Sequence, residues 1–163
     1  MNSLNILFVD DDAVLLSSLK RLLGRIDLNA KICFANSASD ALIIMEEAPI
    51  DLIVADMCMA RMNGHQLLLL VKERYPSTIR VMMTGSPDYD IYRNSMDVCQ
   101  YFLFKPVQIS ALQILLEMVT NKEMPIKSDT DIPSETVREK IEGFSGEKLL
   151  PPSAGTSNTT TIH

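Results

Sequence analysis

Five polar residues with the chemistry to bind a metal ion and a phosphoryl group each follow a short apolar segment. Segments of this kind are typical of buried β-strands, and a parallel sheet binds its ligands at the carboxyl ends of its strands. Three carboxylates at such an edge can hold a hard divalent cation, while a hydroxyl and an ammonium can neutralise phosphoryl oxygens. The pattern predicts a site that takes up phosphate onto a carboxylate. The five residues, in chain order, are Asp10, Asp11, Asp56, Thr84 and Lys105.

Asp10 and Asp11 follow the apolar segment 4–9 directly, and two adjacent carboxylates repel each other. Burying either one without a counter-charge is unfavourable, so we expect a cation between this pair and Asp56. Mg²⁺ is the natural candidate because it binds through a few carboxylates and keeps several waters. The structural alternative is that residues 10–12 only cap the helix that follows, and a run of three Asp taken alone favours that alternative.

Asp56 ends the most apolar segment of the chain, residues 52–55. A carboxylate there could attack a phosphoryl group and form an acyl phosphate, with Mg²⁺ offsetting the repulsion between the two anions. Taken singly, Asp56 could equally be a helix or loop cap, and Lys105 could be a surface lysine at a strand end. For Thr84 taken alone, an ordinary strand residue is the favoured interpretation. Lys105 precedes Pro106, and such a bond adopts the cis form more readily than other peptide bonds. The order of these residues at successive strand ends is what favours a phosphoryl-accepting site.

Apolar segments of strand length alternate with segments of helical period along the first 120 residues. Five strands alternating with five helices indicate successive right-handed βαβ units and therefore a parallel sheet. The sequence thus predicts an α/β fold of the (βα)5 type, with a doubly wound five-stranded parallel sheet. The predicted strands are 4–9, 31–35, 51–55, 79–83 and 100–104, and the predicted helices are about 13–25, 38–47, 64–75, 88–96 and 109–120.

Residues 1–121 are assigned to this domain, and residues 122–163 are assigned to a linker or disordered tail. The tail contains half of the eight prolines and half of the six glycines, together with a Ser- and Thr-rich end. A short helix could form at residues 134–142, between a capping serine and a terminating glycine. We favour a nascent helix without a fixed role over the alternative of a docking peptide.

Composition excludes several classes of protein. The formal net charge of −6 and the pI near 4.9 argue against direct binding to nucleic acid or to an anionic membrane. Three widely spaced cysteines form no zinc motif or disulfide framework, and free thiols fit a reducing cytoplasm. No segment approaches the roughly 20 apolar residues that a membrane span requires. We therefore expect a cytoplasmic protein.

These motifs together resemble the receiver domain of bacterial two-component response regulators, over roughly residues 4–120. The resemblance implies a sheet of strand order 2-1-3-4-5 and transfer of a phosphoryl group from a histidine kinase onto Asp56. It also implies that Thr84 and Lys105 contact the phosphoryl oxygens. The matching motifs are Val9-Asp10-Asp11, Asp56-x-x-Met59 with Asn63-Gly64 downstream, Thr84-Gly85 and Phe104-Lys105-Pro106, and the implied Mg²⁺ ligands are Asp10, Asp11, Asp56 and the backbone carbonyl of Cys58.

The resemblance further implies a conformational switch formed by Thr84 and Phe102. Phe102 stands where this family more often has Tyr, so it can fill the space behind Thr84 but offers no hydroxyl to a partner. Tyr101 is adjacent, but strand alternation directs it to the other face. Ala60 stands where many members have Pro, so the loop there is expected to be less rigid.

Three other residues lie close to these motifs. Cys58 and Ser86 each follow a site residue by two positions, where side chains in this family influence the lifetime of the phosphate. His65 lies at a helix start and has no matching acid or nucleophile pattern. We interpret it as a surface residue.

The favoured function is a phosphorylation-controlled switch rather than an enzyme. Its partners would be a sensor histidine kinase or phosphotransfer protein, and a downstream effector protein or an effector domain missing from this chain. A homodimer is suggested by the resemblance alone. An aspartyl-nucleophile phosphohydrolase is the enzyme alternative, but in those enzymes the nucleophile precedes the acidic pair, whereas here it follows. A binding module that keeps the fold without phosphorylation is the remaining alternative.

Overall fold

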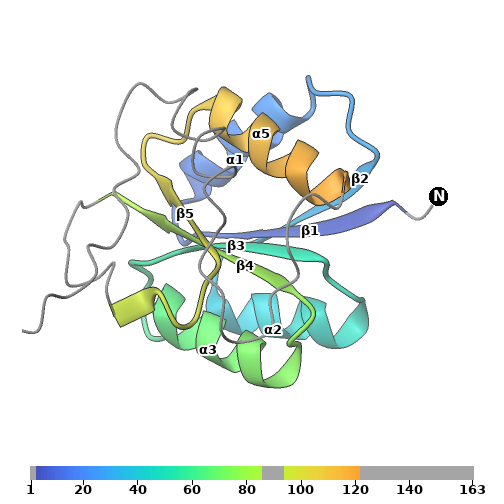
Figure 1. Cartoon of the computed structure of the whole chain (residues 1–163). Coiled ribbons are helices and arrows are strands. Elements are labelled where there is room, and N and C mark those ends of the chain that lie inside the picture. Colours follow the sequence, from blue (N-terminus) through green and yellow to red (C-terminus); the bar gives the residue numbers. More distant parts are fainter. Residues whose placement is uncertain (1–2, 86–93, 122–163) are drawn as a thin grey trace, which may run out of the picture.

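The computed structural model describes residues 3–85 and 94–121, and within them five parallel strands form one sheet (Figure 1). The strand order is β2-β1-β3-β4-β5, and every neighbouring pair runs parallel. The predicted fold class and strand order are therefore confirmed. The strands are β1 (Leu4–Val9), β2 (Ala30–Ala35), β3 (Leu52–Asp56), β4 (Ile79–Thr84) and β5 (Tyr101–Phe104).

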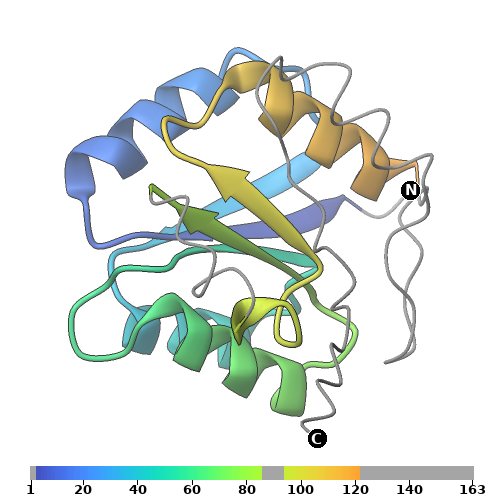
Figure 2. The same cartoon turned by 60° about the vertical axis from the view of Figure 1, so that its left-hand side comes forward.

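Four helices of ten or more residues cover the two faces of the sheet in the described part of the chain. Helices α1 and α5 lie on one face, and α2 and α3 lie on the other (Figures 1 and 2). Of the predicted helix at 88–96, residues 94–95 are helical, and residues 88–93 lie outside the described residues. The predicted tail, with its short helix at 134–142, also lies outside them. The helices are α1 (Ala13–Leu23), α2 (Ala38–Glu47), α3 (Gly64–Arg74) and α5 (Ile109–Thr120).

Polar side chains explain where three of these helices begin. The carboxylate of Asp12 accepts hydrogen bonds from the main-chain N–H groups of Val14 and Leu15, at 2.9 and 3.1 Å, so Asp12 is the N-cap of α1. Ser37 caps α2, and Asn63 begins α3 with a capping box. The cap of α1 therefore does not use the two carboxylates that precede Asp12.

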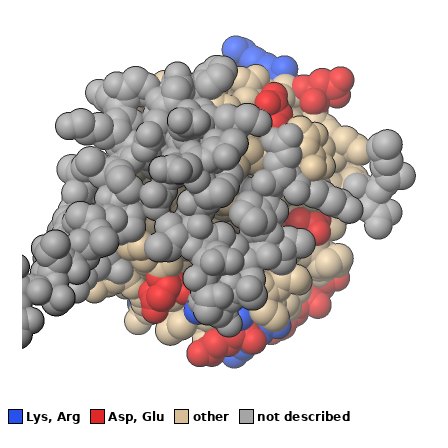
Figure 3. All heavy atoms as spheres, in the orientation of Figure 1, with Lys and Arg blue, Asp and Glu red and all other residues tan. Residues whose placement is uncertain are grey.

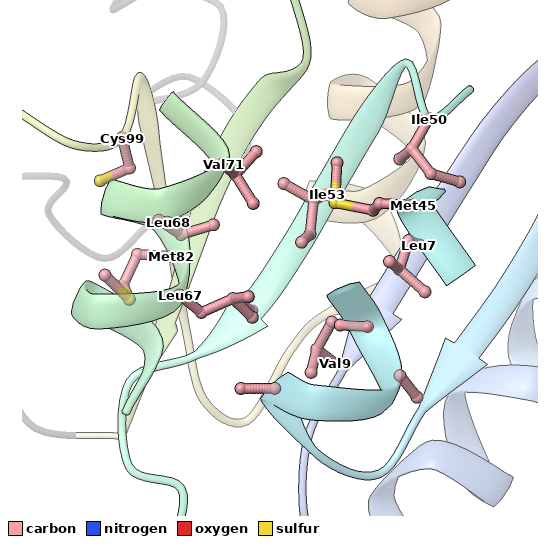
Figure 4. Packing of buried hydrophobic residues seen from close by; sticks show 14 of the residues in the cluster. Leu7, Val9, Met45, Ile50, Ile53, Leu67, Leu68, Val71, Met82 and Cys99 are labelled. Atoms are coloured by element: carbon pink, nitrogen blue, oxygen red, sulfur yellow. The ribbon is translucent and has the colours of Figure 1, made fainter. Parts of the chain in front are cut away.

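Apolar side chains pack in two clusters on opposite faces of the sheet. One cluster lies under α1 and α5, and the other lies under α2 and α3. Figure 4 shows part of the second cluster, in which Leu7 of β1 and Ile53 of β3 point toward the helices that carry residues such as Leu67. Tyr101 packs with the first cluster and Phe102 with the second, as strand alternation predicts.

The outer surface of the described residues carries charges of both signs. In Figure 3, acidic and basic side chains lie side by side along the lower part of the molecule, over α2 and α3. A mixed surface of this kind is ordinary for solvated helix faces. Among the helices of the described residues, none is long and apolar enough to cross a membrane.

Candidate functional site

The predicted site residues lie at the carboxyl ends of β1, β3, β4 and β5, which are neighbours in the sheet. Strands β3 and β4 each extend one residue further than predicted, so Asp56 and Thr84 are the last residues of their strands. The ladder places Asp56 opposite Met83 and Thr84 opposite Phe104. The main chain of both residues is therefore fixed by the sheet rather than by a loop.

Lys105 is the cation at the centre of the site. Its Nζ lies 2.7 Å from Oδ2 of Asp10 and 2.9 Å from Oδ1 of Asp56, and its peptide bond to Pro106 is cis. The side chains of Asp10 and Asp56 are 1% and 7% exposed, whereas that of Lys105 is 23% exposed. The other oxygen of Asp10 accepts the main-chain N–H of Asp12 at 2.8 Å. Buried carboxylates need such partners, so one lysine joins the ends of β1 and β3.

Asp11 completes a group of three carboxylates. It is exposed, and its Oδ2 accepts a hydrogen bond from the main-chain N–H of Ala60 at 3.0 Å. One carboxylate oxygen from each of Asp10, Asp11 and Asp56 lies within 4.8 Å of the other two. Oxygen ligands at this separation can converge on one hard divalent cation. The residues present therefore fit a hard divalent cation such as Mg²⁺ in their chemistry.

Among the side chains that the structure describes, the charges of this cluster do not balance, because three carboxylates face one ammonium. Burial raises the pKa of Asp56. The hydrogen bond from Lys105 lowers this pKa, and the negative charges of Asp10 and Asp11 raise it, so the pKa lies above its usual value. Burial alone would lower the pKa of Lys105, but hydrogen bonds to Asp10 and Asp56 outweigh it and raise that pKa. The lysine thus stays charged, while the cluster favours a further cation.

The remaining predicted residues occupy the same edge of the sheet or its following loop. Thr84 is 5% exposed, and its carbonyl accepts the main-chain N–H of Lys105 at 2.8 Å. Phe102 is partly buried against the cluster under α2 and α3. Cys58 is exposed in the loop after β3, and its role as a carbonyl ligand stays a prediction. Ser86 lies outside the described residues.

The loop between β3 and α3 is tied at both of its ends. The N–H of Met57 donates to the carbonyl of Met83 at 2.8 Å, and the N–H of Gly64 donates to the carbonyl of Met57 at 3.0 Å. Arg61 within the loop has φ of 67°, in the left-handed region that most residues avoid. A Cβ on Gly64 would lie 2.9 Å from the carbonyl carbon of Asp56, so glycine allows α3 to begin close to β3.

Two contacts near the site were not foreseen from the sequence. One is the hydrogen bond from Ala60 to Asp11, for which the sequence gives no signal because every residue except proline carries a main-chain N–H. The other places Nδ1 of His65 3.2 Å from Oγ of Ser95, which is fully buried. His65 is partly buried, so its interpretation as a surface residue is wrong in part. Its partner lies 30 residues away, beyond the reach of any local pattern.

Comparison with known proteins matches most of the chain to one family. Residues 6–117 match the response regulator receiver domain. The DNA-binding transcriptional regulator NtrC of Proteus hauseri is 27% identical over 145 residues, which cover 88% of this chain and 30% of that protein. The response regulator protein FleR of Pseudomonas aeruginosa is 32% identical over 124 residues, covering 74% and 25%. The chain thus spans less than a third of the length of these relatives.

Solved structures agree with the family match. The signal receiver domain of an HD domain-containing protein from Pseudomonas fluorescens Pf-5 superposes with a TM-score of 0.68 at 28% identity, covering 74% of this chain and 96% of that one. A response regulator receiver domain protein from Clostridium thermocellum gives a TM-score of 0.66 at 28% identity, with the same coverage. Chemotaxis protein CheY4 of Vibrio cholerae, at 23% identity, shares the fold, with a TM-score of 0.65 over 71% of this chain and 98% of that one.

Proposed function

Because the chain belongs to the response regulator receiver family, we propose that it is a phosphorylation-controlled switch whose phosphoacceptor is Asp56. One observation carries this proposal. The buried carboxylate at the end of β3 lies beside two further carboxylates and 2.9 Å from an ammonium. This arrangement suits an anion that accepts a phosphoryl group, because nearby cations lower the repulsion as two anions approach.

The phosphoryl group would come from a phosphohistidine of a sensor histidine kinase or a phosphotransfer protein. An oxygen of Asp56 attacks phosphorus, so that a P–O bond forms while the P–N bond breaks. The electron pair of the broken bond leaves with the imidazole nitrogen, and the product is an acyl phosphate. Lys105, which pairs with Asp56 before transfer, would neutralise one phosphoryl oxygen, and the hydroxyl of Thr84 would donate to another.

We assign Mg²⁺ to Asp10, Asp11 and Asp56, with the backbone carbonyl of Cys58 as a further ligand. When bound, the ion supplies positive charge that offsets the charge of the phosphoryl group. The unbalanced cluster supports this assignment, because Lys105 pairs with two carboxylates while Asp11 lies beside them. Lys105 would hold Asp10 and Asp56 in place before any partner protein binds.

Phosphorylation would shift the populations of two conformations in which Thr84 and Phe102 take different positions. A partner protein, an effector domain or a second copy of the chain would read that difference. NtrC is described as a DNA-binding regulator, but this chain matches only 30% of that protein. Because the net charge of the chain is −6, we propose no direct contact of this chain with nucleic acid or a membrane. The free cysteines are consistent with a cytoplasmic location.

Intact-protein mass spectrometry with Mg²⁺ and a small-molecule phosphodonor tests this function. We expect one added phosphoryl group on the wild type, none on Asp56→Asn, and none without Mg²⁺. Asp12→Asn is the matched control, because Asn keeps the cap of α1 and this carboxylate lies outside the group of three. An adduct on Asp56→Asn would refute the assignment of the phosphoacceptor.

The same preparation separates a switch from a phosphohydrolase. A switch of this kind at most removes its own phosphate, so it should not turn over a phosphate monoester repeatedly. We therefore expect no more than one equivalent of phosphate per protein molecule from such a substrate. Sustained release that depends on Asp56 would favour the enzyme alternative instead.

A further inference from the structure

The main-chain N–H of Ala60 links the loop after β3 to the acidic pair after β1. It donates to Oδ2 of Asp11 at 3.0 Å, across 49 residues of sequence. We propose that this N–H is a positioning group that orients Asp11 for the divalent cation of the site. The inference rests on the proposed function, because it assumes that Asp11 is a metal ligand.

Asp11 needs such a group more than the other two carboxylates do. Asp10 and Asp56 are buried and are fixed by Lys105, at 2.7 and 2.9 Å. Asp11 is exposed, so its side chain would otherwise sample several rotamers, and ordering it would oppose metal binding. With Oδ2 engaged by Ala60, the other oxygen of Asp11 remains for a metal. Partners that orient a ligand in this way commonly change metal affinity by about 10- to 100-fold.

The N–H of Ala60 is held in place by the loop around it. The carbonyl of Ala60 accepts the N–H of Met62 at 2.9 Å, and Arg61 between them adopts the left-handed conformation. The loop then ends at Gly64, whose N–H returns to the carbonyl of Met57 at 3.0 Å. A donor on a loop closed in this way can position Asp11 without being ordered by the metal itself.

The device belongs to this chain because of the residue type at position 60. Proline has no N–H, so a chain with Pro at this position could not make the bond. With Ala at position 60, the loop lacks the rigidity of a proline but gains a hydrogen bond to the proposed ligand Asp11. The tie between the two loops replaces part of the rigidity that Ala60 was expected to lose.

Replacing Ala60 by lactic acid tests the inference, because the resulting ester keeps the side chain and replaces the N–H by an oxygen that cannot donate a hydrogen bond. We expect Mg²⁺ affinity, measured by calorimetric titration of the whole chain, to fall by about 10-fold. The matched control is the same replacement at Ala48, whose N–H donates to the carbonyl of Ile44 at 3.0 Å at the end of α2, so it should change the affinity by less than about twofold. Ala60→Pro removes the same N–H genetically and should change the affinity in the same direction.

A double-mutant cycle with Asp11→Asn assigns the effect to this pair. In the Asp11→Asn background, the ester at Ala60 should alter Mg²⁺ affinity by less than about twofold, because the oriented carboxylate is gone. If the wild type binds Mg²⁺ and the ester leaves its affinity unchanged, the positioning role is refuted while the proposed function stands. If the wild type binds no Mg²⁺, both are refuted.

Discussion

The amino ends of the strands form one edge of the sheet, called the amino edge, and their carboxyl ends form the carboxyl edge. The two edges bury charge in opposite ways. At the amino edge, Arg80 is 7% exposed, and its guanidinium donates to the carbonyls of Val98 and Thr78 at 2.8 and 2.9 Å. Its main-chain N–H donates to the side chain of Gln100 at 2.7 Å. At the carboxyl edge, by contrast, the lone ammonium of Lys105 is shared between two of three neighbouring carboxylates.

This difference separates a structural site from the proposed functional one. At the amino edge, main-chain carbonyls accept hydrogen bonds from the buried guanidinium, so these donors have partners within the fold. At the carboxyl edge the described side chains keep an excess of negative charge. Burial raises the pKa of Asp56 there, and the neighbouring Asp10 and Asp11 raise it further. A group of this kind is stabilised when a cation arrives, so we expect stability and ligand binding to be coupled at one edge only.

The largest expected loss of stability follows Arg80→Met at the amino edge. The substitution leaves the carbonyls of Val98 and Thr78 buried without their donor, which should lower the free energy of unfolding by about 4 kcal/mol. Urea denaturation measures this change, and Mg²⁺ should not restore it. Arg25→Met, on an exposed side chain, should stay within about 0.5 kcal/mol. Equal losses for the two arginine variants would show that the buried guanidinium contributes nothing specific.

Lys105→Met should lower the free energy of unfolding by about 3 kcal/mol, because Asp10 and Asp56 lose their shared counter-charge. In this variant, saturating Mg²⁺ should reduce the difference in free energy of unfolding from the wild type, since the ion can replace the missing positive charge. Phosphorylation by a small donor should become about 100-fold slower. Lys20→Met on the exposed face of α1 is the control. If Mg²⁺ does not reduce the loss in free energy of unfolding of Lys105→Met, the two edges do not differ as described.

Gly64→Ala tests how closely α3 must approach the end of β3. The new Cβ would lie 2.9 Å from the carbonyl carbon of Asp56 and from Cα of Met57, so backbone must shift. We expect the free energy of unfolding to fall by about 2 kcal/mol and phosphorylation to become slower, because the shift moves Asp56, the proposed phosphoacceptor. At Gly24 the nearest atom would lie 3.3 Å away with ordinary helical φ, so Gly24→Ala should change stability by less than about 1 kcal/mol.

The smallest expected effect is a gain in stability. The pKa of Asp56 is raised in the folded state, so its contribution to stability is complete below its ordinary value of 3.8 and is lost as the pH rises through the folded value. Asp56→Asn removes this loss, so without Mg²⁺ it should melt a few degrees above the wild type at pH 7. The difference should shrink as the pH falls toward 3.8. A melting temperature of Asp56→Asn below that of the wild type at pH 7 would contradict the conclusion that the charged form of Asp56 destabilises the fold.

Much of this architecture follows from the sequence, because polar residues interrupt apolar segments where the strands end. Asp56 and Thr84 could be placed at the correct edge, although each proved to be the last residue of its strand. The contact from Ala60 to Asp11 could not be predicted, since main-chain donors leave no signature in residue types. The pairing of Arg80 with carbonyls was equally hidden, because it depends on how distant loops close around the guanidinium.

We propose above all that the carboxyl edge is a phosphoryl-accepting site centred on Asp56. Borohydride reduction after treatment with a phosphodonor tests it most directly, because the reagent converts an aspartyl phosphate to homoserine at the modified position. Peptide sequencing by mass spectrometry should find homoserine at position 56 alone, and only when Mg²⁺ is present during phosphorylation. Homoserine at position 10 or 11, or at position 56 without Mg²⁺, would contradict this account.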